Sequence, residues 1–175
     1  ETVIMGIGQG YYLSTPLQLA IATAAIANGG KYFTPRLVDF LKTHKEEDHR
    51  SIPPASSTIL IESENLKKIQ NAMVDVIEAP NGTARNIFTR QYKIAGKTGT
   101  SQVFSIAQDQ EYEEETVVKK RRDHALFIAY APIKEPKIAL AVVVENGGNG
   151  GAVAAPIARK ILDKYLMSPK LSKND

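Results

Sequence analysis

Three strand-like runs follow one another in the second half of the chain, and this order constrains the fold more than any other feature. The runs cover residues 92–103, 124–131 and 137–144. The segment from Pro132 to Pro136 joins the second run to the third, with the length and pattern of a hairpin. Since helical patterns precede and follow the three runs, the sequence predicts an α+β fold, an antiparallel sheet flanked by helices.

The helical patterns begin near the N-terminal end. Thr15 and Gln18 have the spacing of a capping box, and Pro16 suits the first helical position, so we expect a helix from Pro16 to about Ala27. Its many alanines predict close packing, and we expect this helix to be buried. An amphipathic helix is expected to begin with Ser63 as its cap and to end before Pro80, and a last helix is expected over residues 152–166.

Weaker patterns cover the remaining segments. Residues 2–10 read as a short extended piece, and residues 31–55 as an irregular or β-containing excursion. Thr83 is placed to cap a short helical turn that ends at Phe88. An acidic block and then four basic residues occupy positions 105–122, which favours a solvated loop with compensating charges.

Composition narrows the classes of protein. The net charge of +3 is too small to indicate a nucleic-acid partner. With no cysteine in the chain, disulfides are excluded. The longest apolar stretch, residues 17–27, is too short to span a bilayer. Because the chain begins with Glu1 and enters an apolar run at once, we expect it to be part of a longer protein, so the missing membrane segment says nothing about the whole.

The first strand-like run carries Lys97-Thr98-Gly99-Thr100. On a strand, alternate side chains share a face, so Thr98 and Thr100 should point the same way and Lys97 the opposite way. Gly99 lacks a Cβ, which lets another backbone approach. A cation, two hydroxyls and accessible backbone suit a site that holds a carboxylate beside an acyl group under attack. No strand pattern directly precedes this run, so it can lie at a sheet edge, where an extended peptide can pair with it.

Two nucleotide-binding motifs are incomplete in this sequence. Gly96-Lys97-Thr98 resembles the end of a phosphate-binding loop, but Gln91 stands where that motif needs its first glycine. Gly6-Ile7-Gly8 resembles the start of a dinucleotide-binding fingerprint, but its third glycine would fall at Tyr11. Neither motif supports nucleotide binding.

Lys97-Thr98-Gly99-Thr100 matches the third motif of the penicillin-recognising serine transferases and hydrolases. From about Thr2 to Leu166, the chain resembles the class B penicillin-binding transpeptidases, and most of all their elongation-type members in rod-shaped Gram-negative bacteria. The supporting runs are Gly6-Ile7-Gly8-Gln9-Gly10, Thr15-Pro16-Leu17-Gln18, Ala27-Asn28-Gly29-Gly30, Asn81-Gly82-Thr83-Ala84, Tyr92-Lys93-Ile94-Ala95-Gly96, Ser101-Gln102-Val103 and Glu145-Asn146-Gly147-Gly148.

The resemblance implies roles for the third motif. Lys97 would be catalytic, holding positive potential near the substrate carboxylate and directing proton transfers. The hydroxyls of Thr98 and Thr100 would bind that carboxylate, and Gly99 would line the site. The backbone N–H of Thr100 would complete the oxyanion hole. The resemblance implies no metal and no cofactor.

The family's first two motifs are missing. No serine here has a lysine three residues later, so the nucleophilic Ser-x-x-Lys is absent. Ser63-Glu64-Asn65 fits the second motif, Ser-x-Asn, but a helix cap explains Ser63 better. We therefore expect residues 1–175 to be the C-terminal part of one transpeptidase domain, inactive on its own.

The resemblance also implies a setting and partners. The whole protein would be an acyltransferase that cross-links peptidoglycan, anchored at the periplasmic face of the bacterial inner membrane by an upstream segment. Its partners would be stem peptides ending in D-Ala-D-Ala, β-lactam antibiotics, the upstream part of the same protein and membrane proteins of the elongation machinery. Alternatives of the same fold are a β-lactam sensor, a non-catalytic interaction domain or a hydrolase such as a D,D-carboxypeptidase.

Four other polar residues have simpler interpretations. His124 precedes a strand, and a structural role at the strand end is favoured over a place in the cleft. Asn146 is most simply a turn residue before the glycines. For Gln9 and Tyr11, a place in the cleft wall and a role in packing or turn geometry are equally favoured.

Overall fold

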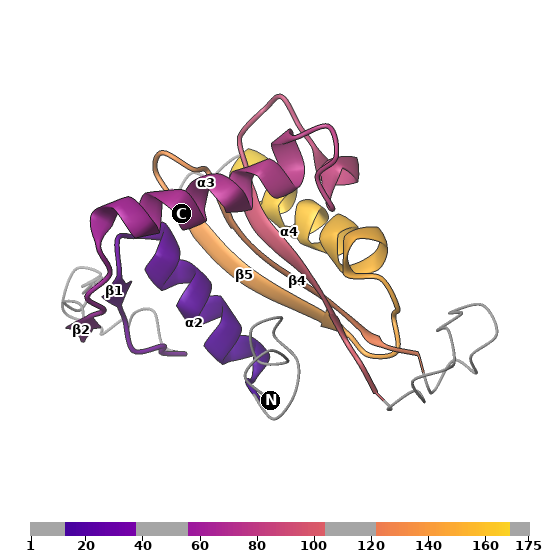
Figure 1. Cartoon of the computed structure of the whole chain (residues 1–175), viewed down its shortest axis with the longest axis horizontal. Coiled ribbons are helices and arrows are strands. Elements are labelled where there is room, and N and C mark those ends of the chain that lie inside the picture. The colour runs from indigo at the N-terminus through magenta and orange to yellow at the C-terminus, as the bar shows by residue number, and fades with distance from the viewer. Residues whose placement is uncertain (1–12, 38–55, 104–121, 169–175) are drawn as a thin grey trace, which may run out of the picture.

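In the computed structural model, residues 13–37, 56–103 and 122–168 are described (Figure 1). The expectations for residues 2–10, for Gln9 and Tyr11, and for nearly all of 105–122 lie outside these ranges. Within them, no helix is long and apolar enough to cross a membrane.

A three-stranded antiparallel sheet forms the centre of the molecule. It consists of β3 (Ala95–Ser101), β4 (His124–Ala131) and β5 (Ile138–Val144), in the order β3-β4-β5. The predicted hairpin is therefore confirmed. The first strand is shorter than the predicted run of residues 92–103.

Two helices cover opposite faces of this sheet, α2 (Pro16–Ala27) on one and α4 (Ala155–Met167) on the other (Figure 1). Because side chains alternate along a strand, Phe127 packs with the buried residues of α4, while Tyr130 packs with Ile26 and Ala27 of α2. A third helix, α3 (Ser63–Glu78), crosses the start of β3. These layers confirm the α+β prediction.

The helix starts follow local sequence chemistry to different degrees. Both hydrogen bonds of the predicted capping box are present at α2, between Thr15 and Gln18. At α3 the cap is Glu62 and Ser63 is the first helical residue, so the predicted cap was wrong by one position. The predicted cap at Thr83 is also wrong, since the short 3-10 helix η1 (Arg85–Ile87) follows Ala84 and has no side-chain cap.

Two further expectations need correction. Only Thr23 and Ala25 of α2 are buried and Leu17 is 56% exposed, so the expectation of a buried helix is wrong for most of its residues. The last helix, predicted over residues 152–166, is divided into a π-helical turn, η3 (Gly150–Ala154), and α4, which begins at Ala155. Of the irregular or β-containing excursion predicted over residues 31–55, residues 38–55 lie outside the described ranges, and β1 (Lys31–Tyr32) is a strand that pairs with β2 (Ser57–Thr58).

Candidate active site

The Lys97-Thr98-Gly99-Thr100 motif lies on β3, which is an edge strand of the described sheet. Within the described ranges, β3 pairs with β4 alone. Lys97 lies opposite Ile128, Thr98 opposite Phe127 and Thr100 opposite Ala125. The expected edge position is confirmed. An edge strand has one row of backbone groups without a partner strand, which is what an added peptide strand requires.

The motif side chains divide between the two faces of the sheet. Cross-strand partners share a face, so Thr98 and Thr100 lie on the side of Phe127 and α4. Lys97 and Gly99 belong to the opposite face, which α2 covers further along the sheet. Lys97 and Thr100 are exposed, and Thr98 is half-buried.

The Lys97 side chain bends toward the edge of its own strand. Its ammonium donates a hydrogen bond to the backbone carbonyl of Thr98 at 2.7 Å. In an antiparallel strand, backbone groups of residues two apart point to the same edge, so the Thr98 carbonyl and the Thr100 N–H point together. The contact brings the cation to the edge that also carries this amide, although alternation alone puts the lysine on the far face.

The Thr98 hydroxyl has a protein partner that the sequence reading missed. It lies 3.0 Å from the hydroxyl of Thr83, and either oxygen can be the donor. The signal was present in Asn81-Gly82-Thr83-Ala84, one of the runs behind the family resemblance, but Thr83 was assigned to a helix cap.

Two glycines of η3 fit closely behind the motif. A Cβ on Gly150 would lie 2.4 Å from the Gly99 carbonyl oxygen and 2.3 Å from that of Leu126. A Cβ on Gly151 would lie 2.3 Å from the Thr83 carbonyl oxygen. Another backbone does approach Gly99, as expected, but the glycine that permits it is Gly150. At Gly99 itself, an added Cβ would come within 3.3 Å of the Leu126 Cβ.

A sequence-family comparison decides the assignment. The model of the penicillin-binding protein transpeptidase domain matches residues 1–163. The chain belongs to this transpeptidase family.

Individual relatives agree with the family. Peptidoglycan D,D-transpeptidase MrdA of Haemophilus influenzae is 40% identical over 173 residues, covering 95% of this chain and 26% of that protein. The crystal structure of Pseudomonas aeruginosa PBP2 in complex with WCK 5153 has 38% identity and a TM-score of 0.75, covering 97% of this chain and 34% of that one. A ceftriaxone acyl-enzyme of penicillin-binding protein A from M. tuberculosis has 30% identity and a TM-score of 0.72, covering 95% and 36%. The chain thus spans about a quarter of the length of the MrdA protein.

In this transpeptidase domain, an ionic network ties α4 to the segment that leads into β3. The Tyr92 hydroxyl donates to Asp163 Oδ1 at 2.6 Å, and Arg159 Nε donates to the same oxygen at 2.8 Å. Arg159 also donates to the carbonyls of Ile87 and Phe88. Burial, followed by the bond to Asp163, raises the pKa of the Tyr92 phenol. Burial also acts to raise the pKa of Asp163, but hydrogen bonds from Arg159 and Tyr92 outweigh it and lower that pKa.

The turn before η3 bonds to the start of β4, which lies opposite the last residue of β3. His124 Nδ1 accepts the backbone N–H of Asn146 at 2.9 Å, which confirms its structural role at the strand end. The neutral imidazole must then carry its proton on Nε2. Asn146 has φ of 54° and its side chain donates to the Arg122 carbonyl, as suits a turn residue. Neither side chain reaches the motif through these bonds.

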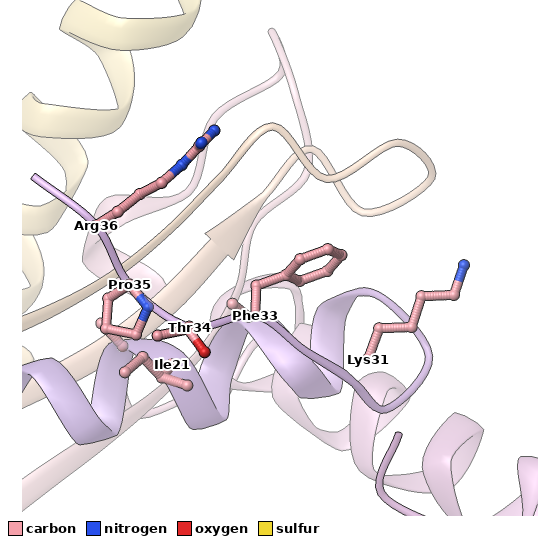
Figure 2. A pocket seen from close by; sticks show the side chains of 8 residues that line it. Ile21, Lys31, Phe33, Thr34, Pro35 and Arg36 are labelled. Atoms are coloured by element: carbon pink, nitrogen blue, oxygen red, sulfur yellow. The ribbon is translucent and has the colours of Figure 1, made fainter. Parts of the chain in front are cut away.

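A pocket lies elsewhere in the transpeptidase domain, between α2 and the segment that follows it. Its labelled lining residues in Figure 2 are Ile21, Lys31, Phe33, Thr34, Pro35 and Arg36. No residue of β3 lines it.

Ser63-Glu64-Asn65, which fits the pattern of the family's second motif, lies in the first turn of α3. This position agrees with the interpretation of these residues as a helix start.

Proposed function

We propose that the whole protein is a peptidoglycan D,D-transpeptidase of the elongation type, and that residues 1–175 are the C-terminal part of its transpeptidase domain. The single observation that carries this proposal is the position of Lys97-Thr98-Gly99-Thr100 on an exposed sheet edge in a chain of this family. The name of the Haemophilus influenzae relative, a peptidoglycan D,D-transpeptidase, supports it.

The reaction is a two-step acyl transfer. The serine of an upstream Ser-x-x-Lys attacks the carbonyl between the two terminal D-alanines, and the C–N bond breaks as the last D-alanine leaves with a proton. An amine of a neighbouring stem peptide then attacks the acyl ester. The new amide is the cross-link, and the serine recovers its proton.

Residues of this chain hold the substrate and its developing charge. The Thr100 hydroxyl binds the terminal carboxylate, and the Lys97 ammonium provides positive potential beside it and favours the proton transfers. The sequence predicts a second carboxylate contact from the Thr98 hydroxyl, which faces the same side of the strand as Thr100, but this hydroxyl already lies 3.0 Å from the Thr83 hydroxyl. The Thr100 N–H and that of the serine form the oxyanion hole, and loss of one such donor lowers the rate by about 10²–10³.

β-Lactams enter the same site. They present a carboxylate and a strained amide in the arrangement of the D-Ala-D-Ala end, so the serine opens the ring and remains acylated. The acyl-enzyme described for the M. tuberculosis relative supports this part of the proposal. The protein would act at the periplasmic face of the inner membrane, anchored by an upstream segment and joined to membrane proteins of the elongation machinery.

Labelling tests the enzyme class. The full-length protein, including the segment that precedes this chain in its gene, is incubated with a fluorescent penicillin and analysed by gel and by intact mass. We expect one covalent adduct, which disappears when the upstream Ser-x-x-Lys serine is changed to alanine. Folded protein that remains unlabelled would overturn the proposal in favour of a non-catalytic interaction domain.

A second assay separates transpeptidation from its alternatives. The full-length protein receives a stem pentapeptide ending in D-Ala-D-Ala and a stem with a free acceptor amine. A transpeptidase forms the cross-linked dimer and releases D-alanine in equal amounts. Release without dimer identifies a carboxypeptidase, and acylation by penicillin with neither product identifies a sensor; either result overturns the transpeptidase assignment.

A further inference from the structure

A hydrogen bond between two threonine hydroxyls joins β3, the strand that carries the motif, to a neighbouring loop. Thr83 lies in the loop between α3 and η1, and Thr98 lies on the α4 face of β3. Their oxygens are 3.0 Å apart, across 15 residues of sequence. This bond joins the β3 edge to a loop whose next residue, Ala84, is fully buried in the core.

The Thr83 loop is itself fixed by close packing and backbone bonds. The Thr83 carbonyl lies against Gly151, where there is no room for a Cβ. The Asn86 side chain donates to the Gly151 carbonyl at 2.9 Å, and Ala84 N–H donates to the Val76 carbonyl at 3.0 Å. The loop therefore offers Thr98 a hydroxyl at a defined position.

The effect of this bond extends from the hydroxyl to the catalytic cation. The Thr98 hydroxyl bonds to the Thr83 hydroxyl, and the backbone carbonyl of the same Thr98 accepts a hydrogen bond from the Lys97 ammonium. Any displacement of Thr98 moves this carbonyl and, two residues along the same edge, the Thr100 N–H. One hydroxyl thus supports both the cation and the oxyanion donor.

We infer that Thr83 is a positioning residue for the acyl-transfer reaction, and that it acts through Thr98. This inference rests on the proposed function. It also assigns the Thr98 hydroxyl a partner on the protein, which distinguishes its role from the carboxylate contact proposed for the Thr100 hydroxyl. A positioning residue of this kind affects the chemical step, whereas a carboxylate ligand affects binding of the intact β-lactam.

The test measures both steps of acylation in the full-length protein. Stopped-flow labelling with a fluorescent penicillin gives the dissociation constant of the initial complex and the rate constant of acylation. The variants are Thr83→Val, Thr83→Ser, Thr98→Val, the double variant Thr83→Val with Thr98→Val, and Thr100→Val. Thr34→Val is the matched control, because it removes a similar hydroxyl pair, with Ser56 at 2.8 Å, beside the separate β1-β2 sheet.

We expect Thr83→Val to lower the acylation rate constant about threefold to tenfold, the effect of one lost hydrogen bond, with the dissociation constant changed less than about twofold. Thr98→Val should have the same effect, and the double variant should be no slower than either single one. Thr83→Ser should keep the wild-type rate. Thr34→Val should leave both constants unchanged, and Thr100→Val should raise the dissociation constant.

Three results would overturn the inference. One is an unchanged acylation rate in Thr83→Val, even if its melting temperature falls. Another is a rise of the dissociation constant in Thr98→Val that adds to the effect of Thr83→Val, because Thr98 would then bind the substrate directly. The third is failure of Thr83→Ser to restore the rate. If the wild-type protein is not acylated at all, the proposed function fails instead, so the two failures are distinguishable.

Discussion

The two faces of the β3-β4-β5 sheet are packed to different degrees. On the α4 face, Phe127, Ala158 and Leu162 have no exposed surface, and this cluster extends to the loop that carries Thr83. On the α2 face, the helix buries only two residues and leaves Leu17 56% exposed. The α4 face is therefore the more completely packed of the two, while α3 contacts β3 and buries Ala95 with Met73 and Tyr130 on the other face. The other face carries the exposed Lys97 side chain, which can bend to the edge.

The largest effect should come from the α4 face. Phe127→Ala removes a fully buried aromatic side chain and should lower the free energy of unfolding by about 3–5 kcal/mol. Leu17→Ala, on the exposed side of α2, should change it by less than about 0.5 kcal/mol. Hydrogen exchange of the β4 amides in the full-length protein measures both. Equal losses would mean that the two faces contribute alike.

Substitutions at Gly150 and Gly99 test how closely η3 packs against the sheet. Gly150→Ala introduces a Cβ between two backbone carbonyls and should cost about 1–3 kcal/mol by the same exchange measurement. Gly99→Ala is the matched control, because its Cβ would meet only the Leu126 Cβ at 3.3 Å and a small shift relieves the contact. A larger cost at Gly99 than at Gly150 contradicts the close packing of η3.

At the edge itself, Thr100→Val removes the proposed carboxylate contact. Penicillin labelling of the full-length protein should slow by about tenfold or more, the effect of losing a hydrogen bond to a charged group. Thr89→Val is the control, since that hydroxyl only accepts the Gln91 N–H, at 3.2 Å. Equal labelling rates in wild type and Thr100→Val would show that this hydroxyl does not anchor the carboxylate.

The network between Tyr92 and α4 should give a pH signature. Tyr92→Phe removes a hydrogen bond and should cost about 1 kcal/mol near neutral pH. The phenol pKa is raised on folding, so its contribution is complete below pH 10 and declines as the pH rises above that value. Stability measured from pH 9 to pH 11.5 should therefore fall more steeply in the wild type than in Tyr92→Phe. Parallel curves would contradict the hydrogen bond.

The smallest effect is expected from the basic cluster that ends the charged stretch. Reversal of the four charges from Lys119 to Arg122 should leave penicillin labelling within about twofold of wild type, because the sequence predicts a solvated loop here and salt screens the charges of such a loop. A large loss of labelling would mean that this stretch belongs to the site.

Sequence patterns predicted the central sheet well because their signals are local. The strand over residues 124–131 was predicted to the residue, and the capping box at Thr15 and Gln18 formed as expected. The predicted caps at Ser63 and Thr83 were wrong, because α3 and η1 begin without a side-chain cap bond and the Thr83 hydroxyl instead meets that of Thr98, on a strand distant in sequence. No local pattern reports such a partner.

By itself, the sequence determined the order of helices and strands, the hairpin, the edge position of β3 and the family, because each depends on periodicity, turn residues or short motifs. Only the tertiary structure decided which groups meet at the motif. The bend of Lys97 to the Thr98 carbonyl, the Thr83–Thr98 bond and the fit of Gly150 depend on distances between segments that are far apart along the chain. The packing of the core sets those distances, and neither residue type nor spacing encodes them locally.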